Sequence, residues 1–399
     1  MTSLTVSLVI DRIAGRSGGA ERVLVNLANA ISRQGHRVEV ICHEPRRGVP
    51  FYPLDSDVLF TNFRPHNSRR TILRRGVDRI RKRAQNASIY PPILRYLQWA
   101  NDHGGFAMRL DRHLSATRPD VAIAFLPNAI VALGLSKRSA ATRRIASLHN
   151  VPEQDFNSAE RWDQNPLDRR LRRSVLTKFD AITVLLPEFR DWFDPALHDR
   201  IAVIPNAIDP IQSSVPQASA NRVIAVGRLA KVKRFNLLID AWSRLPPAYA
   251  QWQCDIYGEG PLSQQLQNQI DAANLTDRVH LRGKTDRIFE AYRQASFLVH
   301  PAEFEGFGLV VGEALAHGLP VVGFADCSGF NHLVRDGENG VHVPITADRA
   351  AALSDALRHL MDAPDERARL GKNGPASVER FDPANVLSRW LILIEKGRE

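Results

Sequence analysis

Two glutamates and two glycines lie close together in the second half of the chain, where an apolar strand pattern gives way to a helical one. Gly306 and Gly308 let the backbone approach a ligand without a β-carbon in the way. The free N–H groups of a helix that begins directly after them would face a phosphate. Glu305 and Glu313 are poor phosphate ligands, so we expect them to bind hydroxyl groups, one on a sugar and the other on a ribose. By itself the segment fits a glycine-rich turn with two solvated acids equally well.

Two cations follow an earlier strand pattern. Gly227 and Arg228 come directly after an apolar run, and Lys233 follows five residues after the arginine. At a strand-to-helix turn, the donor fork of an arginine and the point charge of a lysine would together hold a diphosphate. Taken alone, the same residues fit two surface cations at the edge of a sheet.

The elements that would position these residues alternate between strand and helix along the whole chain. Periodicity predicts an α/β protein with parallel sheets. Ligands in such sheets bind beyond the carboxyl ends of the strands. A linker-like composition at 210–221 places a domain boundary there, which gives domains 1–209 and 210–382, the first completed by a helix at 383–399. The expected strands are 6–10, 38–42, 121–125, 144–148, 181–185, 201–204, 223–226, 254–257, 279–281, 297–300 and 320–323.

Composition sets the remaining limits. A chain of 399 residues is long enough for two domains. Its three cysteines have no zinc-type spacing and fit a reducing compartment. The apolar run 6–10 is too short for a signal peptide, and no apolar stretch reaches membrane-spanning length. Residues 1–200 contain 32 lysines and arginines against 20 aspartates and glutamates, which indicates a polyanionic partner for that half.

The order of these motifs resembles glycosyltransferase family 4, a large family of retaining transferases with the GT-B fold. Glu305 and Glu313 match its E-x7-E motif, and Gly227-Arg-Leu with Lys233 matches its first donor-side motif. Tyr257-Gly-Glu-Gly-Pro261 and the run from Ile204 to Asp209 match as well. The resemblance implies two Rossmann-like domains that face each other across a cleft, and a nucleotide-sugar donor.

The resemblance also implies a set of site residues. Arg228 and Lys233 would bind the donor diphosphate and stabilise the leaving group, while Glu305 would lie near the transferred sugar and Glu313 would hold the ribose. His149, which follows a strand end in the first domain, resembles a family histidine near the sugar; without the family, it is an ordinary polar residue. The other donor contacts that the family implies are Gly18, Gly19, Gly227, Gly258, Lys284, Gly306, Phe307, Gly308, Leu309 and Val310.

The chemistry that the resemblance implies needs no metal or other cofactor, and no Asp-x-Asp pair is present. Retention is explained in this family by attack from the same face, with the leaving phosphate helping to remove the acceptor proton. We therefore name no separate base. His332 stands where family members often have an acid, which weakens any expectation for that loop.

The basic segment 64–83 suggests where the enzyme acts. It contains nine lysines and arginines and one acid, and the aromatic segment 89–99 follows it. Together they would suit the anionic inner face of the plasma membrane, although a solvated helix has the same composition. The enzyme would then be cytoplasmic and peripheral, with a glycan or lipid-linked acceptor. The cations expected at this face are Arg69, Arg70, Arg74, Arg75, Arg79, Arg81, Lys82 and Arg83.

Two alternatives remain at this stage. A nucleotide-sugar epimerase or a sugar phosphorylase would use the same fold without a separate acceptor. A non-catalytic protein could instead use the basic segment to bind a membrane or nucleic acid, but no aromatic RNA-binding motif interleaves with its arginines. The donor sugar, its nucleotide, the acceptor and the linkage are not specified by these residues.

Overall fold

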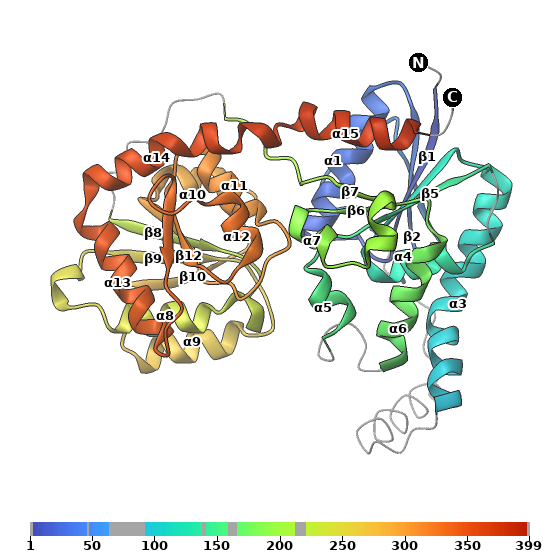
Figure 1. The fold of residues 1–399 in the computed structure, drawn as a ribbon. Helices are drawn as coiled ribbons and strands as arrows, with labels where there is room; N and C mark the ends of the chain where they lie inside the picture. Colours follow the sequence, from blue (N-terminus) through green and yellow to red (C-terminus); the bar gives the residue numbers. More distant parts are fainter. Residues whose placement is uncertain are drawn as a thin grey trace. The chain divides into compact units, whose positions relative to one another are not determined.

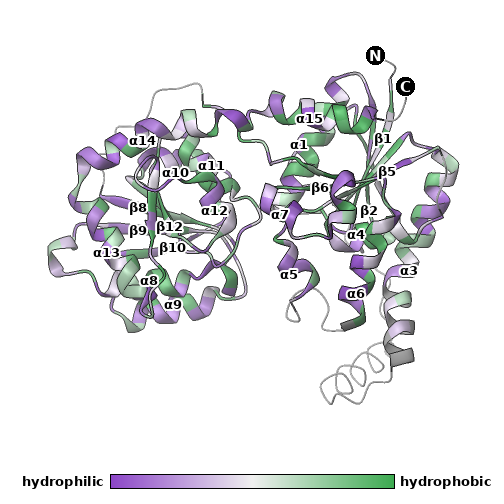
Figure 2. Cartoon of the chain, viewed as in Figure 1, coloured by the Kyte–Doolittle hydropathy of each residue, from purple (hydrophilic) through white to green (hydrophobic). Residues whose placement is uncertain are grey.

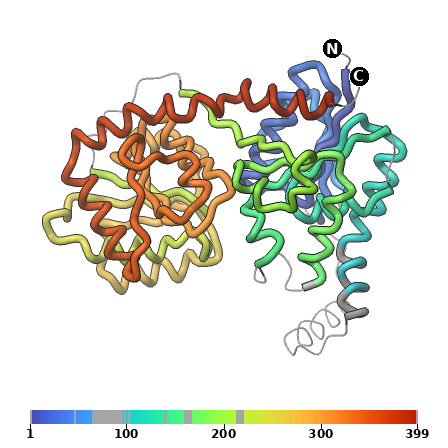
Figure 3. The backbone as a smooth tube through the Cα atoms, in the orientation of Figure 1, coloured from blue at the N-terminus to red at the C-terminus, as the bar shows by residue number. Residues whose placement is uncertain are grey.

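The computed structural model describes residues 3–45, 48–63, 92–137, 141–158, 166–211 and 221–396. Figure 3 traces the backbone, coloured from blue at the N-terminus to red at the C-terminus. The chain divides into two compact units, one formed by Met1–Ile204 with Leu387–Glu399 and the other by Pro205–Val386. The basic segment 64–83, with all the arginines and the lysine expected at a membrane face, lies outside the described residues.

The first unit is built around a parallel seven-stranded sheet with the order β3-β2-β1-β4-β5-β6-β7. Val9 on β1 pairs with Ile41 on β2 and with Ala124 on β4. Its strands are β1 (Thr5–Ile10), β2 (Arg37–Cys42), β3 (Leu59–Asn62), β4 (Val121–Phe125), β5 (Arg143–Ser147), β6 (Ala181–Val184) and β7 (Ile201–Val203). Its helices are α1 (Gly19–Arg33), α3 (Pro92–Thr117), α4 (Leu126–Leu135), α5 (Pro152–Phe156), α6 (Pro166–Val175) and α7 (Pro187–Asp191), with 3-10 turns at Leu176–Lys178 and Pro195–Arg200.

The second unit has a parallel six-stranded sheet with the order β10-β9-β8-β11-β12-β13. Its strands are β8 (Arg222–Val226), β9 (Gln253–Tyr257), β10 (Val279–Gly283), β11 (Phe297–His300), β12 (Val321–Phe324) and β13 (Gly340–Val343). Its helices are α8 (Phe235–Ser243), α9 (Ser263–Ala272), α10 (Ile288–Gln294), α11 (Leu309–Ala316), α12 (Ser328–Leu333), α13 (Arg349–Asp362) and α14 (Pro364–Val378). Short 3-10 turns lie at Lys231–Lys233, Pro247–Tyr249 and Glu379–Phe381, and α15 (Pro383–Glu395) ends the described chain.

Helices cover both faces of each sheet (Figure 1). In the second unit, α8 packs with α9 and α13 on one face, while α11 packs with α14 on the other. Hydrophobic stretches lie within both units, and many helices carry hydrophilic stretches (Figure 2). The core of the second unit lies between β8, β9 and β11 and the helices, with Trp242 and Phe297 fully buried. This arrangement confirms the predicted pair of Rossmann-like α/β domains.

Strand order reverses at one point in each sheet. The chain moves outward from β1 through β2 to β3 and then returns to place β4 on the other side of β1; β8 and β11 repeat this pattern in the second unit. Crossover loops at such a point leave in opposite directions, and ligands of doubly wound sheets commonly bind there, beyond the carboxyl ends of the two central strands. The predicted phosphate-binding residues follow β8 and β11, the two strands at that point.

Candidate active site

The loops that follow β8 and β11 lie side by side. The backbone N–H of Glu303 donates to the carbonyl of Val232 at 2.9 Å, which ties the second loop to the first. Lys233 and Glu305 then form an ion pair and hydrogen bond, although they are far apart in sequence. Their side chains are 17% and 24% exposed, so the pair is largely sheltered from water. The structure therefore brings together one predicted cation and one predicted acid.

The charge of Glu305 is set by its neighbours. Burial raises its pKa, but the Lys233 ammonium and the imidazole of His300 outweigh burial and hold the pKa well below its usual range. His300 Nε2 lies 3.6 Å from the carboxylate oxygen that Lys233 also contacts. Glu305 is consequently an ionised acceptor of hydrogen bonds, which suits a sugar hydroxyl.

A glycine-lined turn leads from Glu305 into α11. Gly308 caps the helix with φ +88°, a left-handed conformation that glycine adopts without strain. A β-carbon on Gly329 would lie 2.7 Å from the carbonyl oxygen of Glu305, so α12 approaches this turn closely. Phe307 is buried edge-on against Phe381, with 5.2 Å between ring centroids. Leu309 and Val310 are partly exposed at the start of α11, where backbone N–H groups are free of helical partners.

Glu313 lies further along α11 and does not share the ion pair. Its side chain is 6% exposed, and its Oε2 accepts a hydrogen bond of 2.9 Å from the hydroxyl of Tyr292 on α10. Tyr292 is fully buried, so its hydroxyl fixes the rotamer of the acid. The orientation of Glu313 is thus set within the protein before any ligand binds.

The loops after β8, β9 and β10 are joined through their backbones. Gly227 N–H donates to the Tyr257 carbonyl at 2.9 Å, and Gly258 N–H donates to the Gly283 carbonyl at 2.8 Å. A β-carbon on Gly258 would lie 1.9 Å from the Gly227 oxygen. Arg228 and Lys284, which follow two of these glycines, are both exposed at this edge. The predicted residues Gly227, Arg228, Gly258 and Lys284 therefore belong to one set of contacting loops.

The predicted residues of the first unit form a separate set. Gly18 caps α1 in the loop after β1, and Gly19 is the first residue of that helix. The buried carboxylate of Glu44 holds this loop by accepting hydrogen bonds from the backbone of Ile13 at 2.8 Å and Ala14 at 2.7 Å. Neither Glu44 nor its role stood out in the sequence, where it is one acid beyond a strand end.

His149 lies just beyond β5. Its ring stacks on Phe125, with centroids 4.9 Å apart, and its Nε2 hydrogen-bonds the hydroxyl of Ser147 at 2.9 Å. Burial lowers the pKa of His149 to about 4, so the imidazole is neutral near pH 7. Within the described part of the chain, its Nδ1 is buried and has no hydrogen-bond partner. A neutral ring with one unused nitrogen suits a contact with a sugar hydroxyl.

The aromatic segment 89–99 is only partly available for a membrane. Tyr96 is 49% exposed, but Trp99 is buried and donates a 2.7 Å hydrogen bond to Asp168 on α6. Asp168 in turn pairs with the buried Arg172 at 2.7 Å. The expectation that this whole segment faces a lipid surface is wrong for Trp99, because a buried carboxylate needs its N–H as a partner.

His332 lies on α12 and packs among aromatic rings. Its ring centroid is 5.8 Å from that of Phe381 and 6.4 Å from that of Phe307. It therefore takes part in the packing behind the glycine turn. Among the described residues, no group of three or more histidine, cysteine, aspartate or glutamate side chains is arranged to hold a metal ion.

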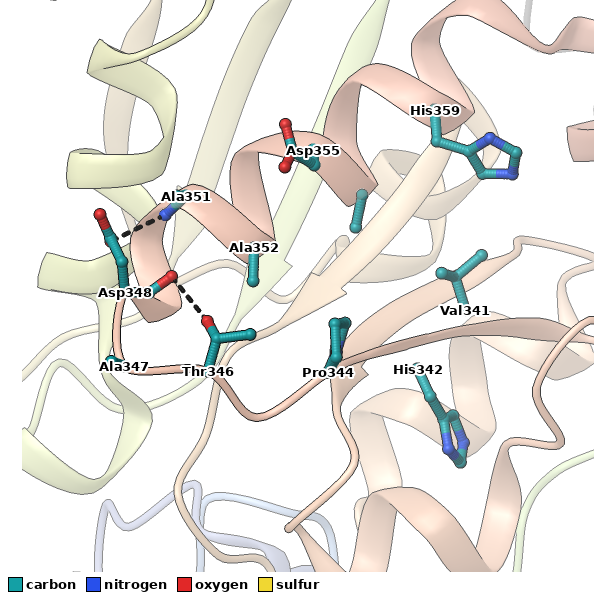
Figure 4. Close-up of a pocket in the computed structure, with 11 residues that line it drawn as sticks. Val341, His342, Pro344, Thr346, Ala347, Asp348, Ala351, Ala352, Asp355 and His359 are labelled. Atoms are coloured by element: carbon teal, nitrogen blue, oxygen red, sulfur yellow. Dashed lines mark hydrogen bonds between the residues drawn. The ribbon is translucent and has the colours of Figure 1, made fainter.

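A separate groove of about 620 Å³ lies between β13 and α13 (Figure 4). Its lining contains none of the predicted site residues and is rich in alanine. Asp348 in this lining caps α13 by accepting from the N–H of Ala351 at 3.0 Å, and it also pairs with Arg244 at 2.6 Å. The carboxylate is thus already used to hold the helix in place.

Comparison with known proteins shows the family of this chain. Residues 17–212 match the family described as Glycosyltransferase Family 4, and residues 210–377 match Glycosyl transferases group 1. The two matches together span most of the chain. The chain belongs to the GT-B glycosyltransferases. This confirms the predicted resemblance and the prediction of an enzyme of the transferase class.

Relatives and solved structures agree with this assignment. The glycosyltransferase is 24% identical, over 98% of both chains, to a Campylobacter jejuni α-1,4-N-acetyl-D-galactosaminyltransferase named for an undecaprenol-diphosphate-linked acceptor. It is 28% identical to the exopolysaccharide phosphotransferase SCO2592 of Streptomyces coelicolor over 53% of its own length, but it spans only 23% of that protein. The structure of Anabaena HepE with UDP and glucose has a TM-score of 0.72 and 19% identity, with coverage of 98% of this chain and 100% of HepE.

Two residues that contact the predicted acids had not been identified from the sequence. His300 is the last residue of β11 and lies next to Glu305, while Tyr292 reaches Glu313 from α10. A polar residue that ends a buried strand, directly before a functional loop, was the available signal for His300. Tyr292 carried no such signal because it appears as an ordinary apolar-face residue of a helix.

Proposed function

We propose that this glycosyltransferase transfers a hexose or N-acetylhexosamine, with retention, from a UDP-sugar to a glycan or lipid-linked acceptor in the synthesis of cell-surface polysaccharide or lipopolysaccharide. The observation that carries the proposal is the sheltered Lys233–Glu305 pair at the β8–β11 reversal point. A cation and an ionised acid beyond the carboxyl ends of these strands would suit the diphosphate and the sugar of a nucleotide-sugar. The UDP bound to HepE and the lipid-linked acceptor named for the Campylobacter enzyme support the choice of substrates.

In this proposal, the chain stabilises the charge that develops as the bond between the anomeric carbon and the phosphate oxygen breaks. Arg228, Lys233 and the first N–H groups of α11 would neutralise the departing diphosphate. Glu305 would bind a hydroxyl of the transferred sugar, and Glu313 would bind the ribose. The acceptor hydroxyl attacks from the same face and its proton passes to the leaving phosphate. The two cations supply the positive charge that a bound metal would otherwise provide, so we propose that no metal is required.

We propose that the enzyme is cytoplasmic and peripheral, and that its first domain meets the acceptor at the inner face of the plasma membrane. The positive excess of residues 1–200 supports this, because an anionic leaflet attracts clustered lysines and arginines. None of the helices in the described part of the chain has the length and hydrophobicity that a membrane crossing requires. Flotation with phosphatidylglycerol vesicles tests the proposal. A variant that replaces Arg69, Arg70, Arg74 and Arg75 with glutamate should stay unbound, and equal flotation of both proteins would reject it.

Transfer itself is tested with a panel of UDP- and GDP-sugars, with and without a polyprenyl-diphosphate-linked acceptor. We expect UDP release that requires the acceptor, and a product whose anomeric configuration by NMR equals that of the donor. Lys233→Met should abolish turnover, whereas Lys231→Met, at an exposed position two residues earlier in the same 3-10 turn, should retain it. Conversion of the donor without an acceptor would instead indicate an epimerase, and release of a sugar phosphate would indicate a phosphorylase.

A further inference from the structure

A buried histidine stands directly behind the proposed sugar-binding acid. His300 ends β11, and its side chain is only 2% exposed. Its Nε2 lies 3.6 Å from Oε2 of Glu305, and its ring lies parallel to that of Phe330 within 7°, with centroids 6.4 Å apart. The imidazole is therefore held in one orientation, with a nitrogen directed at the carboxylate.

This nitrogen makes no hydrogen bond. Within the described residues, Nε2 of His300 is buried without a hydrogen-bond partner, because 3.6 Å is too long for a hydrogen bond. The carboxylate oxygen nearest to it is taken by Lys233 instead. Buried polar atoms in folded proteins nearly always have partners, so an unused one beside a functional carboxylate requires an explanation.

The Lys233 ammonium cannot pair closely with both Glu305 and a donor diphosphate. Under the proposed function, its ammonium must neutralise the donor diphosphate, which draws it away from Glu305. The carboxylate would then lose its main partner in a sheltered position, and an ionised buried group without a partner is strongly disfavoured. Among the described residues, the buried thiol of Cys327 also interacts with this pair; burial raises its pKa to about 12, so it stays neutral. Arg234 and Glu303, in the same two loops, pair with each other. His300 is the group placed to replace the lysine.

We propose that His300 is a positioning residue that takes Glu305 over from Lys233 when the donor binds. A hydrogen bond from Nε2–H of His300 replaces the lysine at the carboxylate, and Glu305 stays in place for the sugar hydroxyl while Lys233 turns to the diphosphate. This inference rests on the proposed function and adds a partner to the same site. Burial lowers the pKa of His300 and Lys233 lowers it further, while Glu305 opposes both effects. The ring is therefore neutral at rest, and the exchange uses the tautomer whose single N–H is on Nε2.

The test separates binding of the nucleotide from turnover. His300→Leu removes the donor nitrogen, and His300→Gln restores an N–H close to the same point. We expect the leucine variant to bind UDP within about twofold of the wild type by calorimetry but to lose about 10- to 100-fold in kcat, the effect of one hydrogen bond to a charged group. The glutamine variant should recover most of that loss.

His36 provides the matched control. It is 5% exposed, and its Nε2 is likewise buried and without a partner among the described residues, but it lies directly before β2, at the amino-terminal end of the strands of the other unit. His36→Leu should lower the melting temperature while leaving kcat unchanged.

Each outcome decides one point. If the wild type neither binds UDP nor transfers sugar, the proposed function fails. If it does both but His300→Leu keeps full kcat, the exchange is refuted while the function stands. Equal losses in UDP affinity and kcat, or failure of glutamine to rescue, would show a merely structural role and also overturn the proposal.

Discussion

Replacement of Gly258 by alanine should damage the site through a single contact. A β-carbon at this position would lie 1.9 Å from the carbonyl oxygen of Gly227, far inside the normal separation of about 3.3 Å for a carbon and an oxygen. The Gly227 oxygen is a backbone atom, and a β-carbon is attached directly to the backbone, so neither can rotate away as the end of a long side chain would. Gly258 also has φ +143°, in a region that only glycine occupies readily. The loop after β8, which carries Arg228, must therefore move.

The expected cost combines two effects. Backbone strain contributes about 1–3 kcal/mol, and the forced overlap contributes about 1–3 kcal/mol more. For a unit of this size, each kcal/mol lowers the melting temperature by about 2–4 °C, so we expect a fall of roughly 5–20 °C. Displacement of Arg228 should also weaken UDP binding by about tenfold or more, since a charge-assisted contact is lost. Thermal unfolding and calorimetric titration with UDP measure the two effects separately.

Gly337→Ala is the matched control. Gly337 has φ +70° but has no atom within 4 Å of an added β-carbon, so it reports strain without overlap. We expect a cost of about 1–2 kcal/mol there and unchanged UDP affinity. If both variants melt at the same temperature, the contact argument is wrong. If Gly258→Ala melts early yet binds UDP as tightly as the wild type, the diphosphate does not bind at this loop.

Three further expectations follow from single residues. Tyr292→Phe removes the hydroxyl that fixes Glu313, so UDP affinity should fall by about tenfold, and an unchanged dissociation constant by calorimetry would separate Glu313 from the ribose. In the folded chain His149 stays neutral down to about pH 4, whereas in the unfolded chain it takes up a proton below about pH 6.5. The free energy of unfolding should therefore decrease as the pH is lowered from about 6.5 to about 4. His149→Gln should flatten that part of the stability profile, and identical profiles for both proteins would refute the assigned charge state. Burial raises the pKa of Cys42 and Cys327 to about 12, and all three cysteines are buried. A thiol reagent at pH 8 should therefore modify the chain only after unfolding, and rapid labelling of the native protein would contradict the packing.

Hydrophobic patterns in the sequence were sufficient for most of the fold. Central strands such as Val121–Phe125 and Phe297–His300 are largely apolar runs, as expected where helices cover both faces. The two strands that this approach missed lie at sheet edges. Leu59–Asn62 is half exposed along its length, and Gly340–Val343 contains a glycine and a histidine, so neither has an apolar run of its own. Their positions depend on pairing with β2 and β12, which a single segment does not reveal.

The site could be predicted only as far as its motifs extend. The resemblance named Lys233 and Glu305, and the strand order explains why residues so far apart in sequence meet. Their direct ion pair, and the positions of His300 and Tyr292 behind the two acids, depend on side-chain packing between different elements. No spacing rule relates these residues, so only the folded structure identifies them.

Each unit fixes the charge state of one predicted site residue before any donor binds. Burial keeps His149 neutral in the first unit, whereas Lys233 keeps Glu305 ionised in the second. Both states favour a transition state in which the sugar gains positive charge. A protonated histidine beside that sugar would repel it, and a protonated glutamate would lose its attraction for it. Under the proposed function, a neutral imidazole and an ionised carboxylate would each suit such a transition state, and each state follows from burial or pairing within its own unit.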